Sequence, residues 1–203
     1  MILWDVNEGS KLATILSLAN NDEKDKRKLS DSLIVTPDGL FDGSPGAWRQ
    51  IQWRFSEKTL DVAPVEIYFN DYYYPGLLSD LMKGLRPHAS RNVSELDRRQ
   101  PVLTVSLPDG SAPKSIQSRT AALQVSIRNA PAGARDLRLF RNGSLIKLWP
   151  GEVVLDANGK STLTADVPVS AGENRYTAYA FNRDNVKSED AGQIGRASCR
   201  ERV

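Results

Sequence analysis

The stretch that most constrains the fold of this chain is residues 101–190, where short segments alternate apolar and polar side chains. In residues 121–128, every second position is apolar: Ala121, Leu123, Val125 and Ile127. Successive residues of a strand point to opposite faces, so this alternation predicts a strand with one apolar face. Residues 102–107 alternate in the same way. We therefore expect this part of the chain to be built from β-strands.

Two Asn-Gly pairs, Asn142-Gly143 and Asn158-Gly159, interrupt these alternating segments. Asn-Gly adopts positive φ at both central positions of a two-residue turn, so each pair predicts a β-hairpin. The first hairpin would join residues 136–141 to residues 144–149, and the second would join residues 153–156 to residues 161–167. About seven strands at this spacing predict an immunoglobulin-like β-sandwich.

Near the end of the sandwich, Tyr176 lies two residues before Ala178 in the segment expected to be the sixth strand. This spacing is typical of a tyrosine corner, in which the hydroxyl bonds to nearby backbone, and Ala178 occupies the place of an antibody cysteine. We expect both residues to face the core in a structural role. Alternation then places Tyr179 and Phe181 on the opposite face, either exposed or covered by a neighbouring module.

Residues 1–44 predict short strands joined by tight turns. Leu3-Trp4-Asp5 is similar to the end of the third strand of a WD-repeat propeller blade, and an ordinary hairpin with a buried Trp4 fits the same residues equally well. Pro37-Asp38-Gly39 predicts a turn with Gly39 at positive φ. Asp38 and Asp42 flank that turn, and we expect them to bond to their own backbone rather than to form a two-carboxylate site.

Residues 45–99 predict a helical connector rich in aromatic residues. Ser44 and Pro45 are a helix-start signal, and Trp48, Ile51 and Phe55 follow at helical spacing. A second short helix is expected over residues 77–84, ended by Gly84. We interpret Trp48 and Trp53 as packing residues.

The connector also contains a cluster of tyrosines, which leaves two interpretations open. It either forms a surface that stacks sugars or docks a peptide, or it buries its rings and directs its hydroxyls to polar partners. The residues of the possible binding surface are Tyr68, Tyr72, Tyr73 and Tyr74, with Trp149 of the sandwich as a further candidate.

The composition offers little for catalysis. The chain holds one cysteine, Cys199, and one histidine, His88. Residues 194–203 resemble a translated sequencing adaptor, so Cys199 is not expected to belong to the natural protein, and His88 lies in the connector. A metal site needs several convergent ligands, and no His/Cys cluster is present. We therefore expect no catalytic, cofactor-binding or metal-ligating residue, and no enzyme activity from this chain.

The net charge of +2 does not indicate a nucleic-acid-binding protein, because the adaptor-like residues alone contribute three Arg and one Glu. No apolar run is long enough to cross a membrane. The remaining residues contain no cysteine, which fits a reducing, cytoplasmic compartment. We expect protein partners, and neither nucleic acid nor membrane.

Several separated motifs resemble, in order, a segment of bacterial proteins that join a WD-repeat propeller to a caspase-like cysteine peptidase domain. The motifs lie at residues 36–44, Trp48, residues 53–55, 68–70, 74–78 and 96–101. In that family an immunoglobulin-like sandwich follows, ending in a pattern like Ala178-Tyr179-Ala180-Phe181-Asn182, and the peptidase domain comes after it.

The resemblance implies a mainly β chain in four parts. They are a partial propeller blade (residues 1–44), a short helical connector (45–99), an immunoglobulin-like sandwich (100–193) and an adaptor-derived tail (194–203). The family's catalytic His and Cys lie in the peptidase domain, which these residues do not include. The implied function is a non-catalytic scaffold or interaction region between propeller and peptidase. The alternative is a sandwich that binds carbohydrate or peptide.

Overall fold

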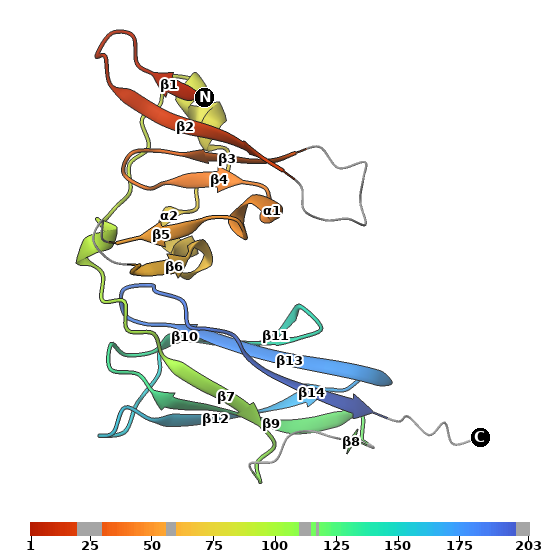
Figure 1. Ribbon diagram of the computed structural model, residues 1–203. Helices are drawn as coiled ribbons and strands as arrows, with labels where there is room; N and C mark the ends of the chain where they lie inside the picture. The colour runs from red at the N-terminus through yellow and green to blue at the C-terminus, as the bar shows by residue number, and fades with distance from the viewer. Residues whose placement is uncertain (20–29, 56–59, 110–114, 117, 198–203) are drawn as a thin grey trace. The chain divides into compact units, whose positions relative to one another are not determined.

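The computed structural model describes residues 1–19, 30–55, 60–109, 115–116 and 118–197 (Figure 1). The described residues are mainly β-strands, as expected, with a few short helices. They belong to two compact units, Met1–Leu96 and Asp97–Val203.

The first unit is organised around an antiparallel four-stranded meander, whose strands pair in sequence order (Figure 1). Its strands are β1 (Ile2–Trp4), β2 (Lys11–Leu18), β3 (Asp31–Val35) and β4 (Phe41–Gly43). One face of the meander carries Ala13 and Ile34, which pack in one core cluster with Leu77 and Leu81 of α3. The predicted turn is confirmed: Gly39 has φ 98°, and the Thr36 N–H donates to the Leu40 carbonyl at 2.9 Å.

The rest of the first unit consists of short elements. They are α1 (Pro45–Trp48), β5 (Gln52–Arg54), β6 (Val62–Pro64), η1 (Val65–Tyr68), α2 (Phe69–Tyr72), α3 (Leu77–Met82) and η2 (Val93–Glu95). The expected second helix is confirmed in α3. Gly84 follows it at φ 86°, and the Leu85 N–H donates back to the Asp80 carbonyl at 3.0 Å, which closes the helix end.

The helix expected over residues 47–55 is wrong for most of its length. Pro45 does open α1, but the helix ends at Trp48, and the Ser44 hydroxyl bonds to Asp31 at 2.6 Å rather than capping the helix. Residues 52–54 form β5 instead, paired with β6. In β5, Gln52 and Arg54 are exposed and Trp53 between them is half-buried. This alternation has the period of two of a strand, so the packing of Trp53 prevails over the helical spacing.

The second unit is a β-sandwich, as predicted. One sheet has the order β12-β9-β7 and the other the order β11-β10-β13-β14-β8. The strands are β7 (Val102–Ser106), β8 (Ser115–Ile116), β9 (Thr120–Asn129), β10 (Arg135–Arg141), β11 (Ser144–Glu152), β12 (Ser161–Pro168), β13 (Gly172–Phe181) and β14 (Ala191–Ala197). With β7, β9 and β12 in one sheet and β10, β13 and β14 in the other, the strands follow the A-B-E and C-F-G placement of immunoglobulin-type sandwiches.

The core of the sandwich lies between the two sheets. The apolar face predicted for residues 121–128 is confirmed, because Leu123, Val125 and Ile127 are fully buried in it. On the facing sheet, the core side of β13 carries Tyr176, Ala178 and Ala180. The facing predicted for this strand is therefore correct.

Of the two predicted hairpins, the structure contains the first. Arg141 pairs with Ser144 across Asn142 (φ 49°) and Gly143 (φ 82°). The second is wrong as a hairpin, because β12 pairs along its whole length with β9 and residues 153–156 are not a strand. Those residues lead from one sheet to the other, and Asn158-Gly159 forms a turn held by the Asp156 carboxylate, which accepts from the Asn158 and Lys160 N–H groups.

The last described strand, β14, crosses the boundary that we expected at residue 193. Its residues up to Ala197 pair antiparallel with β13, and its end pairs parallel with β8. The first four adaptor-like residues, 194–197, thus occupy part of a sandwich strand. Cys199 lies outside the described residues. Within the described ranges, no helix is both long and apolar enough to cross a membrane.

Candidate interaction sites

The tyrosine cluster of the first unit is a packed core rather than a surface. Tyr68 and Tyr72 are 1% and 0% exposed, and the Trp53 ring meets them edge-on at centroid distances of 5.6 and 5.1 Å. The Tyr72 hydroxyl donates to the Arg91 carbonyl at 2.7 Å, and burial raises the pKa of Tyr72. The expectation of a binding surface is therefore wrong for these two tyrosines.

Tyr73 and Tyr74 are half-buried at the margin of the same cluster. The Trp48 ring packs edge-on against Tyr73 at 5.3 Å. The Tyr74 hydroxyl donates to Asp80 at 2.9 Å, and this hydrogen bond to a carboxylate raises the pKa of Tyr74. Trp149 is in the other unit, where it packs against the sandwich core with the Lys147 ammonium 5.8 Å from its ring centroid. These residues thus do not gather into one surface within either unit.

Trp48 and Trp53 take the packing positions that the sequence suggested, but Trp4 does not. The Trp4 side chain is 55% exposed on β1, a terminal strand of the meander, so the expectation of a buried Trp4 is wrong. The residue of β1 that packs against the core is Leu3, whose side chain points to the face opposite Trp4.

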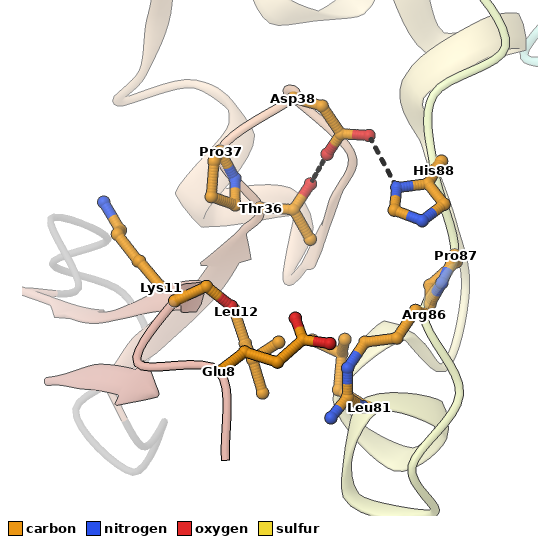
Figure 2. Close-up of a pocket in the computed structure, with 11 residues that line it drawn as sticks. Glu8, Lys11, Leu12, Thr36, Pro37, Asp38, Leu81, Arg86, Pro87 and His88 are labelled. Atoms are coloured by element: carbon orange, nitrogen blue, oxygen red, sulfur yellow. Dashed lines mark hydrogen bonds and ion pairs between the residues drawn. The ribbon is translucent and has the colours of Figure 1, made fainter. Parts of the chain in front are cut away.

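A hollow of about 370 Å³, lined by both polar and apolar side chains, lies beside the Pro37–Gly39 turn in the first unit. Figure 2 shows the Asp38 carboxylate between the Thr36 hydroxyl and the His88 ring. Thr36 donates to Asp38 at 2.5 Å, and the nearest carboxylate oxygen lies 3.9 Å from His88 Nδ1. That same oxygen accepts the Ala89 N–H at 2.6 Å.

These contacts hold backbone in place rather than activate a nucleophile. Thr36 is only 6% exposed and directs its hydroxyl hydrogen to the turn, while the His88 side chain is 80% exposed. Asp42 bonds similarly: it accepts the N–H of the adjacent Gly43 and that of Gly76, both at 2.8 Å. The expectation that these aspartates bond to their own backbone is confirmed for Asp42, which accepts the Gly43 N–H, and is wrong for Asp38, whose backbone partner is the distant Ala89. Among the described residues, no group of three or more His, Cys, Asp or Glu is arranged to hold a metal.

In the sandwich, Tyr176 is buried as predicted, but it is not a tyrosine corner. Its hydroxyl has no hydrogen-bond partner within the described residues, so the expected bond to backbone is wrong. Burial raises the pKa of this phenol. The backbone near the start of β13 is fixed instead by Asn174, which lies two residues before Tyr176 on the same core-facing side of the strand.

Asn174 is fully buried and uses both atoms of its amide. Its Oδ1 accepts the Ser170 N–H at 3.0 Å, and its Nδ2 donates to the carbonyls of Ser170 (2.7 Å) and Gly172 (3.2 Å). Sequence reasoning missed this residue, although its even spacing from Tyr176 and Ala178 places it on the inward face. A buried polar side chain at a strand start needs local partners, and the turn beside it supplies them.

A second buried amide, Asn182, joins two motifs that lie far apart in the sequence. Its Oδ1 accepts the N–H groups of Asp184 and Val186, both at 2.9 Å. Its Nδ2 donates to the carbonyls of Asp97 (2.5 Å) and Arg99 (3.2 Å). We call this arrangement of residues 97–100 on residues 182–187 the Asn182 clamp.

Two further bonds complete the Asn182 clamp. The Asp97 N–H donates to the Asp184 carboxylate at 2.8 Å, and the Gln100 amide donates to the Lys187 carbonyl at 2.8 Å. The side chain of Arg99 hydrogen-bonds to Asp97 and lowers the pKa of that carboxyl to about 2. The segment that precedes β7 is therefore fastened to the loop between β13 and β14.

The face of β10 and β13 that points away from the core carries aromatic rings and cations. The rings of Phe140 and Tyr179 stack at 5.3 Å, and Tyr179 meets Phe181 edge-on at 5.7 Å. The Arg138 guanidinium lies 5.2 Å from the Phe181 centroid, and the Lys187 ammonium lies 4.4 Å from that of Tyr179. Tyr179 is thus on the outer side, as alternation predicted, and it is half-buried among these neighbours.

Comparison with known proteins adds little to this geometry. No protein-family model matches the sequence, and no curated protein matches it. A solved structure described as fibronectin(III)-like modules of Clostridium thermocellum CbhA is similar in part, with 10% sequence identity and a TM-score of 0.33. The matched region covers 49% of this chain and 100% of the chain in that solved structure. The description of the second unit as a β-sandwich follows from its own strand pairing and core.

Proposed function

We propose that this chain is a non-catalytic interaction region that links a WD-repeat propeller to a caspase-like cysteine peptidase domain. Both of those domains would lie mainly outside these 203 residues. The partners would be proteins, in the cytoplasm, and not nucleic acid or membrane. The antiparallel meander over β1–β4 supports the propeller part of the proposal, since a blade is a four-stranded antiparallel sheet.

The observation that carries the proposal is the Asn182 clamp. Two of the motifs that suggested the family, residues 96–101 and residues 178–182, are far apart in sequence, and Asn182 bonds one to the other. A segment that only spaced two domains would need no such attachment. The Asn182 clamp fixes the course of the chain into β7, where the sandwich begins.

The described residues also favour a non-catalytic role. The Thr36 hydroxyl donates to the Asp38 carboxylate of the turn, and the His88 side chain is exposed. Two of the tyrosines that suggested a sugar-stacking surface, Tyr68 and Tyr72, are buried. A carbohydrate-binding module therefore has less support than a protein-interaction region. On a glycan array we expect no binding by this chain.

The natural gene sequence on both sides of these residues tests the proposal most simply. We expect WD repeats upstream of residue 1, and downstream of residue 193 a domain with the His and Cys of a caspase-like peptidase. A stop codon directly after codon 193, or a domain of another class there, would contradict the proposed link.

A further inference from the structure

The outer face of the five-stranded sheet combines exposed leucines with the aromatic rings described above. Leu145 and Leu148 of β11 are 51% and 42% exposed. They pair across the strands with Phe140 and Arg138 of β10, and Arg138 pairs in turn with Tyr179 of β13. Strands β11, β10 and β13 are neighbours in the sheet (Figure 1). Residues that pair across strands share a face, so these side chains form one stripe over the three strands.

The charge on this sheet is mainly positive. Strands β10, β11 and β13 carry five basic residues, and only three acidic ones. Two of the acids are already paired, Asp136 with Arg135 at 2.9 Å and Glu152 with Arg183 at 3.3 Å. The opposite sheet of β7, β9 and β12 carries one Arg and one Asp.

Arg138 is the basic residue at the centre of the stripe. Among the described residues it bonds to the Tyr179 hydroxyl at 3.2 Å and lies over two rings, and it makes no ion pair. Arg175, which faces the same side of β13, is exposed, and its side chain makes no ion pair within the described ranges. A partner that brings carboxylates to this face would find cations that are not already neutralised.

We propose that this outer face of β11, β10 and β13 is a docking surface for a protein segment rich in acidic residues and anchored by apolar side chains. The apolar anchors lie against Leu145, Leu148 and Phe140, and the carboxylates pair with Arg138 and Arg175. This inference rests on the proposed role as an interaction region and names the surface and the partner class.

The test uses the full chain and a short fluorescein-labelled peptide of alternating Glu and Leu, followed by fluorescence anisotropy. Matched peptides of alternating Lys and Leu, and of Glu and Ser, separate charge from apolar contact. We expect the Glu–Leu peptide to bind tightest and to bind more weakly as salt is raised. Absence of Glu–Leu binding, or equal binding of the Lys–Leu peptide, would overturn the inference.

Variants locate the binding on the molecule. Arg138→Glu should weaken binding of the Glu–Leu peptide by about tenfold or more, as expected for reversing a contact charge. Because Arg138 also packs over rings, Arg175→Glu serves as a second variant with an exposed side chain. Arg128→Glu, on the outer face of the other sheet, is the matched control and should leave binding unchanged. If Arg128→Glu weakens peptide binding as much as the other two variants do, binding depends on net charge alone and the proposed docking surface is wrong.

The peptide-binding experiment and the gene sequence test the two proposals independently. Loss of the docking surface would leave the proposed link between propeller and peptidase untouched. Conversely, a gene that lacks the flanking domains would overturn the link without altering which face binds the peptide.

Discussion

Buried amide groups, rather than the buried phenol, fix the loops of the sandwich. Asn174 and Asn182 each use both the oxygen and the nitrogen of the side chain, whereas the Tyr176 hydroxyl finds no partner among the described residues. A buried hydroxyl without a hydrogen bond destabilises the fold, whereas removing a hydrogen-bonded amide leaves its former partners without a bond. The two kinds of residue should therefore respond oppositely to truncation.

For this reason Tyr176→Phe should change the free energy of opening of the sandwich by no more than about 0.5 kcal/mol, or raise it slightly. Asn174→Ala should lower it by about 1–3 kcal/mol, because the Ser170 N–H and carbonyl lose their partner. Amide hydrogen exchange of β13 in the full chain measures both. A larger loss from Tyr176→Phe than from Asn174→Ala would show that the phenol is bonded after all.

Gly39 gives a second prediction at this scale. It has φ 98°, and a Cβ there would lie 2.7 Å from Cη2 of Trp53. Gly39→Ala should therefore destabilise the first unit by about 2–4 kcal/mol, from the left-handed backbone plus overpacking.

Gly76 is the matched control for Gly39, with φ 83° and nothing within 4 Å of a Cβ. Gly76→Ala should cost only about 1–2 kcal/mol, from the backbone alone. The thermal unfolding midpoint of the first unit, followed by tryptophan fluorescence, compares the two. Equal shifts would mean that the Trp53 contact does not constrain Gly39.

At the scale of elements, local alternation and turn chemistry predicted most of the sandwich. Ala121 to Ile127 alternate strictly, and Asn142-Gly143 joins two strands that do pair. The sequence misled where a long-range contact decides. Asn158-Gly159 has the same turn chemistry, but β12 pairs with β9, whose identity as partner no local pattern reveals. Trp48, Ile51 and Phe55 lie at helical spacing, but residues 52–54 form β5. The rings on which Trp53 packs, Tyr68 and Tyr72, come later in the sequence, so the local pattern did not reveal them.

The candidate sites were less predictable than the fold for the same reason. The aromatic content of the connector was evident, but whether its rings were buried depended on how β5, η1 and α2 meet. The Asn182 clamp joins residues 97–100 to residues 182–187, and neither segment alone signals the contact. The inward facing of Tyr176 and Ala178 and the outward facing of Tyr179 did follow directly from strand periodicity.

The Asn182 clamp yields a prediction for elements cut from the chain. A fragment of residues 97–203 should be more stable to urea than one of residues 101–203, because the shorter one lacks Asp97 and Arg99, which accept from Asn182. Asn182→Ala should cost about 1–3 kcal/mol more in the longer fragment than in the shorter one. Equal costs in the two fragments would mean that the bonds to Asp97 and Arg99 contribute nothing to stability.

At the scale of the whole molecule, the first unit contains a meander and an aromatic cluster, and the second is a sandwich. In the sandwich, strands β10, β11 and β13 carry more basic than acidic residues. Each unit uses its polar side chains chiefly to hold its own backbone, as Asp38, Asp42, Asn174 and Asn182 do. Our central proposal is that the chain itself carries out no hydrolysis.

The most direct test is to incubate the purified Cys199→Ala chain with fluorogenic peptides that end in Arg or Asp. The account predicts release of fluorophore at the rate of buffer alone, because the Thr36 hydroxyl beside Asp38 is almost fully buried and its hydrogen is held by the carboxylate of the turn. Cleavage that persists through purification to homogeneity, and that is lost on Thr36→Val or His88→Ala, would contradict it and assign catalysis to the hollow beside Asp38.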